Sequence, residues 1–105
     1  MQINHKLPYE QLRDEVLITR VARGEPIAFE ILYDRYAGTI LGVCLKIIHN
    51  QTAAEGALQE TFWQIWQRAT TYEARGGSFE GWLFRIARNL AMDVHRQRLS
   101  ELDRK

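Results

Sequence analysis

The chain has 105 residues, a formal net charge of +1 and a hydrophobic share of 46%. This length allows one domain with one core, and two prolines and seven glycines argue against long disordered stretches. The single cysteine, Cys44, excludes an internal disulfide, and because no apolar run approaches the ~20 residues that span a bilayer, we expect a cytoplasmic protein.

The N-terminal half predicts two helices. Residues 1–8 are expected to be flexible, and a helix is predicted from Pro8 to Arg23, since proline suits a first helical turn and Gly24 a stop. Its inward residues are Leu12, Val16, Leu17 and Val21. A second helix is predicted from Pro26 to His49, with Gly38 and Gly42 allowing close approach of a neighbour and Cys44 buried. Its apolar stripe has helical spacing and comprises Phe29, Leu32, Tyr33, Tyr36, Ile40, Val43 and Ile47.

A third helix is predicted from Thr52 to Ala69. Thr52 and Glu55 have the spacing of a capping box, which would fix the helix start. Trp63 falls outside the apolar stripe, so it is expected either across a helix junction or exposed in an interface. The stripe itself comprises Leu58, Phe62, Ile65, Trp66 and Ala69.

The last predicted helix, Ser78–Arg98, follows a glycine-containing loop, Thr70–Gly77. Ser78 is a suitable N-cap, and Glu80 suits the positive end of the helix dipole. One face is apolar, with Phe79, Trp82, Leu83, Ile86, Ala87, Leu90 and Val94. The other face is mainly basic and polar, with Arg85, Arg88, Asn89, Met92, His95 and Arg96. The predicted architecture is an all-α, compact bundle of four helices.

The residue pattern contains no catalytic set. His5, His49 and His95 lie far apart in sequence, and there is no metal-binding motif or glycine-rich phosphate loop, so we expect neither an enzyme, a metal nor a cofactor. The basic face of the last helix favours nucleic acid as a partner. The alternative is internal pairing, of Arg88 with a distant carboxylate and of Arg96 with Asp93. In the loop, Tyr72 either stacks on an unpaired base or lies on the bundle surface.

Three sequence blocks carry a family resemblance: AFEILYDRY at 28–36, QETFWQIW at 59–66 and SFEGWLFRIARN at 78–89, continuing to Asp93 and Arg96. In this order and spacing, over Leu12 to Arg98, the chain resembles region 2 of an extracytoplasmic-function (ECF) sigma factor. Such proteins are promoter-specificity subunits of bacterial RNA polymerase.

The resemblance implies two partners. The third helix would dock on the clamp helices of the polymerase largest subunit through Glu55, Gln59, Glu60 and Trp63. The loop and the start of the last helix would capture an unstacked base of the non-template strand of the minus-ten promoter element, through Tyr72, Gly76, Gly77, Ser78 and Phe79. The strand phosphates and neighbouring base edges would be held by Arg85, Arg88, Asn89 and Arg96. An anti-sigma factor that covers region 2 is also implied.

One departure from the family pattern keeps an alternative function open. Gly56 stands where the family commonly has an acidic residue before the Gln-Glu pair, which weakens the expectation of clamp binding. The resemblance also implies a second helical domain, so residues 1–98 are expected to be the region 2 domain and 99–105 the start of a linker. The alternative function is a helical protein-interaction module that is sigma-like but does not bind DNA.

Overall fold

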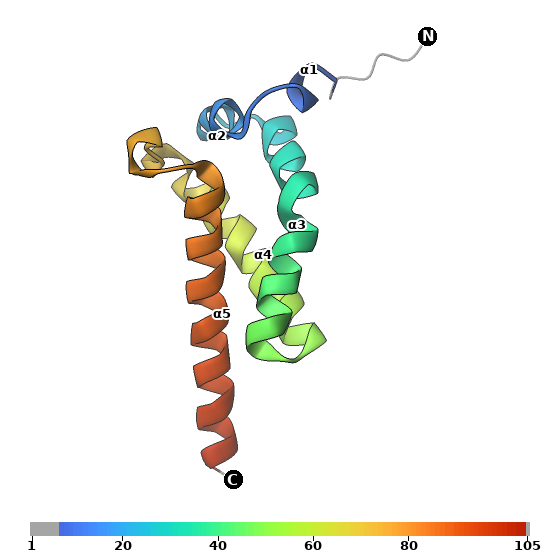
Figure 1. The fold of residues 1–105 in the computed structure, drawn as a ribbon, viewed down its shortest axis with the longest axis vertical. Helices are drawn as coiled ribbons and strands as arrows, with labels where there is room; N and C mark the ends of the chain where they lie inside the picture. The colour runs from blue at the N-terminus through green and yellow to red at the C-terminus, as the bar shows by residue number, and fades with distance from the viewer. Residues whose placement is uncertain (1–6, 105) are drawn as a thin grey trace.

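The computed structural model describes residues 7–104, and their regular structure is entirely helical (Figure 1). The predicted flexibility of residues 1–8 stays a prediction: residues 1–6 lie outside the described range, and Pro8 belongs to the short helix Leu7–Glu10. The all-α bundle is confirmed. Its elements are α1 (Leu7–Glu10), α2 (Asp14–Ala22), α3 (Pro26–Ile48), α4 (Gln51–Arg68), the 3-10 turns η1 (Ala69–Thr71) and η2 (Ala74–Gly76), and α5 (Phe79–Asp103).

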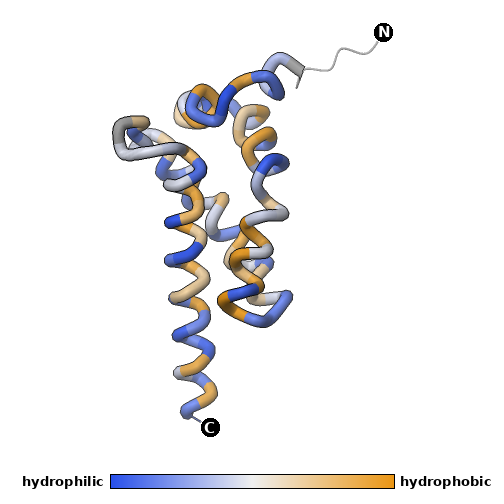
Figure 2. The backbone as a smooth tube through the Cα atoms, viewed as in Figure 1, coloured by the Kyte–Doolittle hydropathy of each residue, from blue (hydrophilic) through white to orange (hydrophobic). Residues whose placement is uncertain are grey.

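Three long helices, α3, α4 and α5, pack against one another and form the core (Figure 1). α2 lies at the end of the bundle where η1 and the start of α5 also lie. Apolar positions recur along each long helix between hydrophilic ones, as Figure 2 shows, because only one face of each is buried. The fully buried side chains include Leu17, Ile18, Leu32, Ile40, Cys44, Ile65, Phe79 and Leu83.

The contact between α3 and α4 is built from aromatic rings. The Phe29 ring lies edge-on to Trp66 and Phe62, at centroid distances of 5.4 and 6.1 Å, and Tyr33 lies 4.8 Å from Phe62. Each such pair adds about 0.5–1.5 kcal/mol beyond its buried area. Because each helix supplies rings four residues apart, the spacing already visible in the sequence sets this interface.

The predicted helix from Pro8 to Arg23 is in fact two helices. The chain breaks between α1 and α2, where backbone carbonyls lose their helical partners. Arg35 of α3 replaces those partners: its guanidinium donates to the carbonyls of Glu10 and Leu12, at 2.9 and 2.8 Å, and pairs with Asp14 at 2.8 Å. A contact more than twenty residues away thus stabilises the break, which local periodicity does not reveal.

Two packing predictions in α2 and α3 were wrong. Val16 is 39% exposed, and Ile18 is fully buried instead, because the shorter α2 turns a different face to the core. Gly38 and Gly42 do not mark a close approach, since a Cβ built on either would meet no atom within 4 Å. The burial of Cys44 is confirmed, and burial raises the pKa of its thiol.

The N-caps of α4 and α5 differ in how well they were predicted. The capping box of Thr52 and Glu55 was wrong: Asn50 is the N-cap, and its side chain accepts the Ala53 N–H at 2.8 Å. His49 ends α3 in the left-handed conformation, at φ 58°, which places Asn50 at the cap position. The Ser78 cap is confirmed, since its hydroxyl accepts the Gly81 N–H at 3.0 Å.

The last helix continues past its predicted end at Arg98, to Asp103. Residues 99–103, expected to start a linker, are therefore helical, because no proline or glycine follows Arg98 to end the pattern. Leu99 and Leu102 on this extension are 48% and 64% exposed. Among the described helices, none is both long and apolar enough to cross a membrane.

Candidate nucleic-acid interface

A recess of about 200 Å³ lies where the loop after α4 meets the start of α5. Gly77 has φ 118°, a conformation that favours glycine, and this allows the turn into the Ser78 cap. Of the predicted base-binding residues, Tyr72, Gly76, Gly77 and Ser78 line the recess. The remaining lining residues are Thr71, Glu73, Trp82 and Arg85.

The half-buried Tyr72 holds the loop against α5. Its hydroxyl donates to the Gly77 carbonyl at 3.3 Å, and its ring lies 5.3 Å from Trp82 and 6.2 Å from Phe79. Burial raises the pKa of the Tyr72 phenol. The ring packs on α5, and Tyr72 also lines the recess, so its stacking on an unpaired base stays a prediction.

Phe79 requires a correction. Its side chain is 0% exposed, and its ring lies 5.9 Å from Tyr36 and 6.1 Å from Trp82. Phe79 is therefore a core residue next to Trp82 and offers no surface for direct DNA contact. Helical spacing placed both Phe79 and Trp82 on the apolar face, and only the family resemblance placed Phe79 at the DNA. Trp82 is only half-buried, and the Arg68 guanidinium lies 6.0 Å from its ring centroid.

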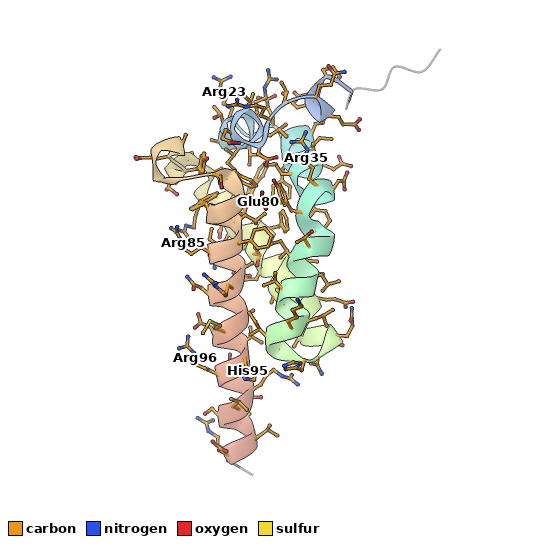
Figure 3. All side chains as sticks on the ribbon, viewed as in Figure 1. Arg23, Arg35, Glu80, Arg85, His95 and Arg96 are labelled. Carbon is orange, nitrogen blue, oxygen red and sulfur yellow. The ribbon has the colours of Figure 1, made fainter. Side chains whose placement is uncertain are left out.

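The outer face of α5 presents cations without internal partners. Arg85, Arg88 and Asn89 are exposed, and no described residue pairs with them or accepts their hydrogen bonds. Arg96 differs, because it forms the predicted ion pair with Asp93. Figure 3 shows Arg85 and Arg96 on the side of α5 away from α3. Arg85, one of these unpaired cations, also lines the recess.

A second exposed face lies on α4. Glu55, Gln59, Glu60 and Trp63 all point outward, and the Trp63 side chain is 54% exposed, which settles its position in favour of exposure. Three of them are spaced four residues apart and form one stripe. Gly56 lies beside this stripe, and a Cβ built on it would meet no atom within 4 Å, so packing does not require glycine there.

The comparisons with known proteins assign this chain to a family. The sequence matches Sigma-70 region 2 over residues 32–100. The chain belongs to the Sigma-70 region 2 family. Among the described residues of this region 2 domain, no group of three or more His, Cys, Asp or Glu side chains is placed to hold a metal ion.

The relatives of this region 2 domain are sigma factors. The chain is 30% identical over 88 residues to ECF RNA polymerase sigma factor SigK of Mycobacterium sp. (strain KMS), covering 84% of this chain and 46% of that protein. It is 37% identical over 82 residues to the RNA polymerase sigma-H factor of Pseudomonas aeruginosa, covering 77% and 42%. The chain thus spans about half the length of the curated relatives it matches.

A solved structure shares the fold. An engineered region 2 of sigmaE in complex with GTAAAA, determined by NMR, superimposes with a TM-score of 0.72 at 30% identity, covering 80% of this chain and 86% of that one. The predicted family and the all-helical sigma region 2 architecture are confirmed.

Proposed function

We propose that this chain is the part of a promoter-specificity subunit that docks on core RNA polymerase and recognises and melts the minus-ten element. The observation that carries the proposal is the recess lined by Tyr72, Gly77 and Trp82, with the unpaired Arg85 at its edge and Arg88 three residues further on. The engineered region 2 of sigmaE, which has the same fold, was solved in complex with GTAAAA, and this supports single-stranded DNA as the ligand class.

The physical basis is single-strand capture. A base in duplex DNA is stacked and paired, so it reaches the recess only after it leaves the helix, at a cost of a few kcal/mol. Aromatic surfaces and cations along the backbone offset that cost, because they bind the open strand in ways that a closed duplex does not allow. Melting is therefore favoured by binding, and no covalent bond of the DNA is made or broken.

The test compares single strands in a fluorescence-anisotropy titration. A short non-template strand is selected from a randomised pool and compared with its scrambled sequence and with its duplex. We expect the selected strand to bind most tightly, more weakly at higher salt, and more weakly to Arg88→Ala. Equal affinity for selected and scrambled strands would contradict the proposal.

A blocking variant tests the recess itself. Gly76 lines the recess, and a Cβ built on it meets no atom within 4 Å, so Gly76→Leu adds a side chain at the mouth with little strain. Gly56→Leu is the matched control, because its Cβ is equally unhindered and lies on α4. We expect Gly76→Leu alone to lose sequence preference.

We propose that the exposed stripe of α4 docks on the clamp helices of the polymerase largest subunit. Trp63 offers apolar area, and Glu55, Gln59 and Glu60 suit a basic partner. Trp63→Ala should abolish binding to purified core polymerase in an equilibrium assay without lowering stability. Gly56→Asp should strengthen that binding more than Gly56→Ala does, because only the first restores the acidic residue that the family commonly has.

A second candidate is a protein-interaction module that does not bind DNA. Gly56 favours it, because the family's acid is missing there, and so does the exposed Trp63, which fits an anti-sigma factor that covers this face. Binding to polymerase or to a regulator, with no sequence-dependent affinity for any single strand, would select this candidate over the first.

A further inference from the structure

The loop that forms the recess rests on the start of α2. α2 packs against η1 and against α5, and Figure 1 shows it at the same end of the bundle as the loop. Burial, followed by the charges of Glu15 and Asp14, raises the pKa of the Tyr72 phenol, so the first turn of α2 lies close to that ring. None of the described residues that line the recess belongs to α2. Any effect of α2 on a ligand in the recess is therefore indirect.

A series of contacts joins the start of α2 to the recess. The Tyr36 hydroxyl of α3 donates to the Asp14 carboxylate, which also pairs with Arg35 at 2.8 Å. The Tyr36 ring lies 5.9 Å from the Phe79 ring, and the Phe79 ring lies 6.2 Å from Tyr72. Both centroid distances fall within the range of about 4.5–7 Å that aromatic pairs prefer. The series therefore runs from a carboxylate of α2, through α3 and the core, to a ring that lines the recess.

Phe79 is the link in this series, because it is closely surrounded. Its side chain is fully buried. Three rings from three parts of the chain pack on it: Tyr36 of α3, Tyr72 of the loop and Trp82 of α5. Buried side chains are packed as densely as a crystal, so one ring moves only if its neighbours move. Because the hydrogen bond to Asp14 restrains the Tyr36 ring, a change there should reach the two rings that line the recess.

We propose that Asp14 and Tyr36 are positioning residues for the recess: their hydrogen bond sets, through Phe79, where the loop holds Tyr72. Neither side chain lines the recess, and both act through Phe79. This inference rests on the proposed function and adds to it that single-strand affinity depends on the place where α2 meets α3.

Two other tyrosines provide matched controls. Tyr9 donates its hydroxyl to Glu25 at 2.6 Å at the same end of the bundle, and no described ring pair joins it to Phe79. Tyr33 lies on α3, as Tyr36 does, but its ring packs on Phe62. Tyr9→Phe therefore removes a similar bond from phenol to carboxylate, and Tyr33→Phe a hydroxyl of the same helix, without reaching the loop.

The first measurement needs no ligand. In the loop, the N–H groups of Tyr72 and Gly77 donate to the carbonyls of Ala69 and Ala74, both at 3.3 Å, and amide hydrogen exchange reports how often these bonds open. We expect Tyr36→Phe to speed exchange at both amides by about two- to ten-fold, the factor that one hydrogen bond corresponds to. Tyr9→Phe and Tyr33→Phe should leave both amides unchanged. Equal exchange at these amides in all three variants would refute the inference.

The second measurement is single-strand affinity, by anisotropy with the selected strand, at a temperature at which every variant is folded. Tyr36→Phe should weaken binding by about two- to ten-fold. Tyr72→Phe should add little in the double variant, because both changes loosen the same loop and their effects are then not additive. Asp14→Asn keeps an oxygen that accepts the Tyr36 hydroxyl, so it should bind more tightly than Asp14→Ala.

The outcomes separate this inference from the proposed function. If the parent chain prefers the selected strand and Tyr36→Phe binds it as tightly as Tyr9→Phe does, the inference fails and the proposed function stands. Additive losses in the double variant, or equal binding by the two Asp14 variants, would refute the inference in the same way. If the parent chain prefers no strand, the proposed function fails, and amide exchange still tests whether Asp14 and Tyr36 position the loop.

Discussion

Arginine has opposite roles in two regions of the molecule. One region is the junction where α1 and α2 meet α3, and the other is the outer face of α5. At the junction, Arg35 donates to two backbone carbonyls and pairs with Asp14, and Arg20 lies 3.6 Å from Glu25 with its guanidinium 5.3 Å from the Tyr9 ring. On α5, Arg85 and Arg88 have no partner among the described residues.

The difference separates arginines that stabilise the fold from arginines that are available to a ligand. Leaving the carbonyls bound by Arg35 without a donor would cost free energy of folding, so removing that side chain should affect stability. Arg85 and Arg88 are exposed and unpaired, so they contribute little to the free energy of folding. Their removal should affect only binding. Pairing within the fold makes this distinction, which net charge does not.

The largest effect is expected at Phe79, which sequence analysis assigned to DNA. Because its ring is fully buried, Phe79→Ala should lower the free energy of unfolding by about 3–5 kcal/mol, measured by urea denaturation. Unchanged stability with lost single-strand binding would instead return Phe79 to the ligand-contacting group.

Removing Arg35 comes next. Arg35→Ala should cost about 1–3 kcal/mol of unfolding free energy, because it removes the donor to two backbone carbonyls and the ion pair to Asp14, whose carboxylate keeps only the Tyr36 hydroxyl. The matched control is Arg88→Ala, which should stay within about 0.5 kcal/mol of the parent chain. Equal losses in the two variants would erase the contrast between the two regions.

A smaller effect is expected at alkaline pH. Burial, followed by the hydrogen bond to Asp14, raises the pKa of Tyr36 well above its ordinary value of 10.0. Because the raised pKa belongs to the folded state, the protonated phenol stabilises the fold fully below pH 10, and this contribution falls as pH rises beyond it. Urea unfolding at increasing pH should show a steeper loss for the parent chain than for Tyr36→Phe.

The smallest effect concerns the Tyr72 hydroxyl. Tyr72→Phe keeps the ring on Trp82 and removes only the hydrogen bond to Gly77, so stability should fall by no more than about 1 kcal/mol. Single-strand affinity should fall several-fold, since the loop is then held less firmly around the recess. An affinity equal to that of the parent chain would show that the hydroxyl does not position the loop.

Local sequence rules predicted the helices that local forces determine. The stripes of α3, α4 and α5 and the Ser78 cap were found because helical spacing and cap chemistry are visible within a few residues. The break before α2 was missed because Arg35, far along the chain, stabilises it.

The candidate site divides in the same way. The loop glycines, Ser78, Arg85 and Arg88 were predicted from residue type and from the family resemblance. The burial of Phe79 agrees with its place on the apolar face of α5. The position of Trp82 at the recess depends on how the loop folds back onto α5, which periodicity does not give.

The most direct test of the account measures single-strand affinity against salt concentration for the parent chain, Arg88→Ala and Arg96→Ala. Each phosphate contact contributes about 0.7 to the slope of log affinity against log salt for single strands. We predict that Arg88→Ala lowers the slope by about that amount and that Arg96→Ala, whose side chain is already paired with Asp93, changes it much less. Equal slopes for the parent chain and Arg88→Ala would contradict the assignment of the unpaired arginines to nucleic acid.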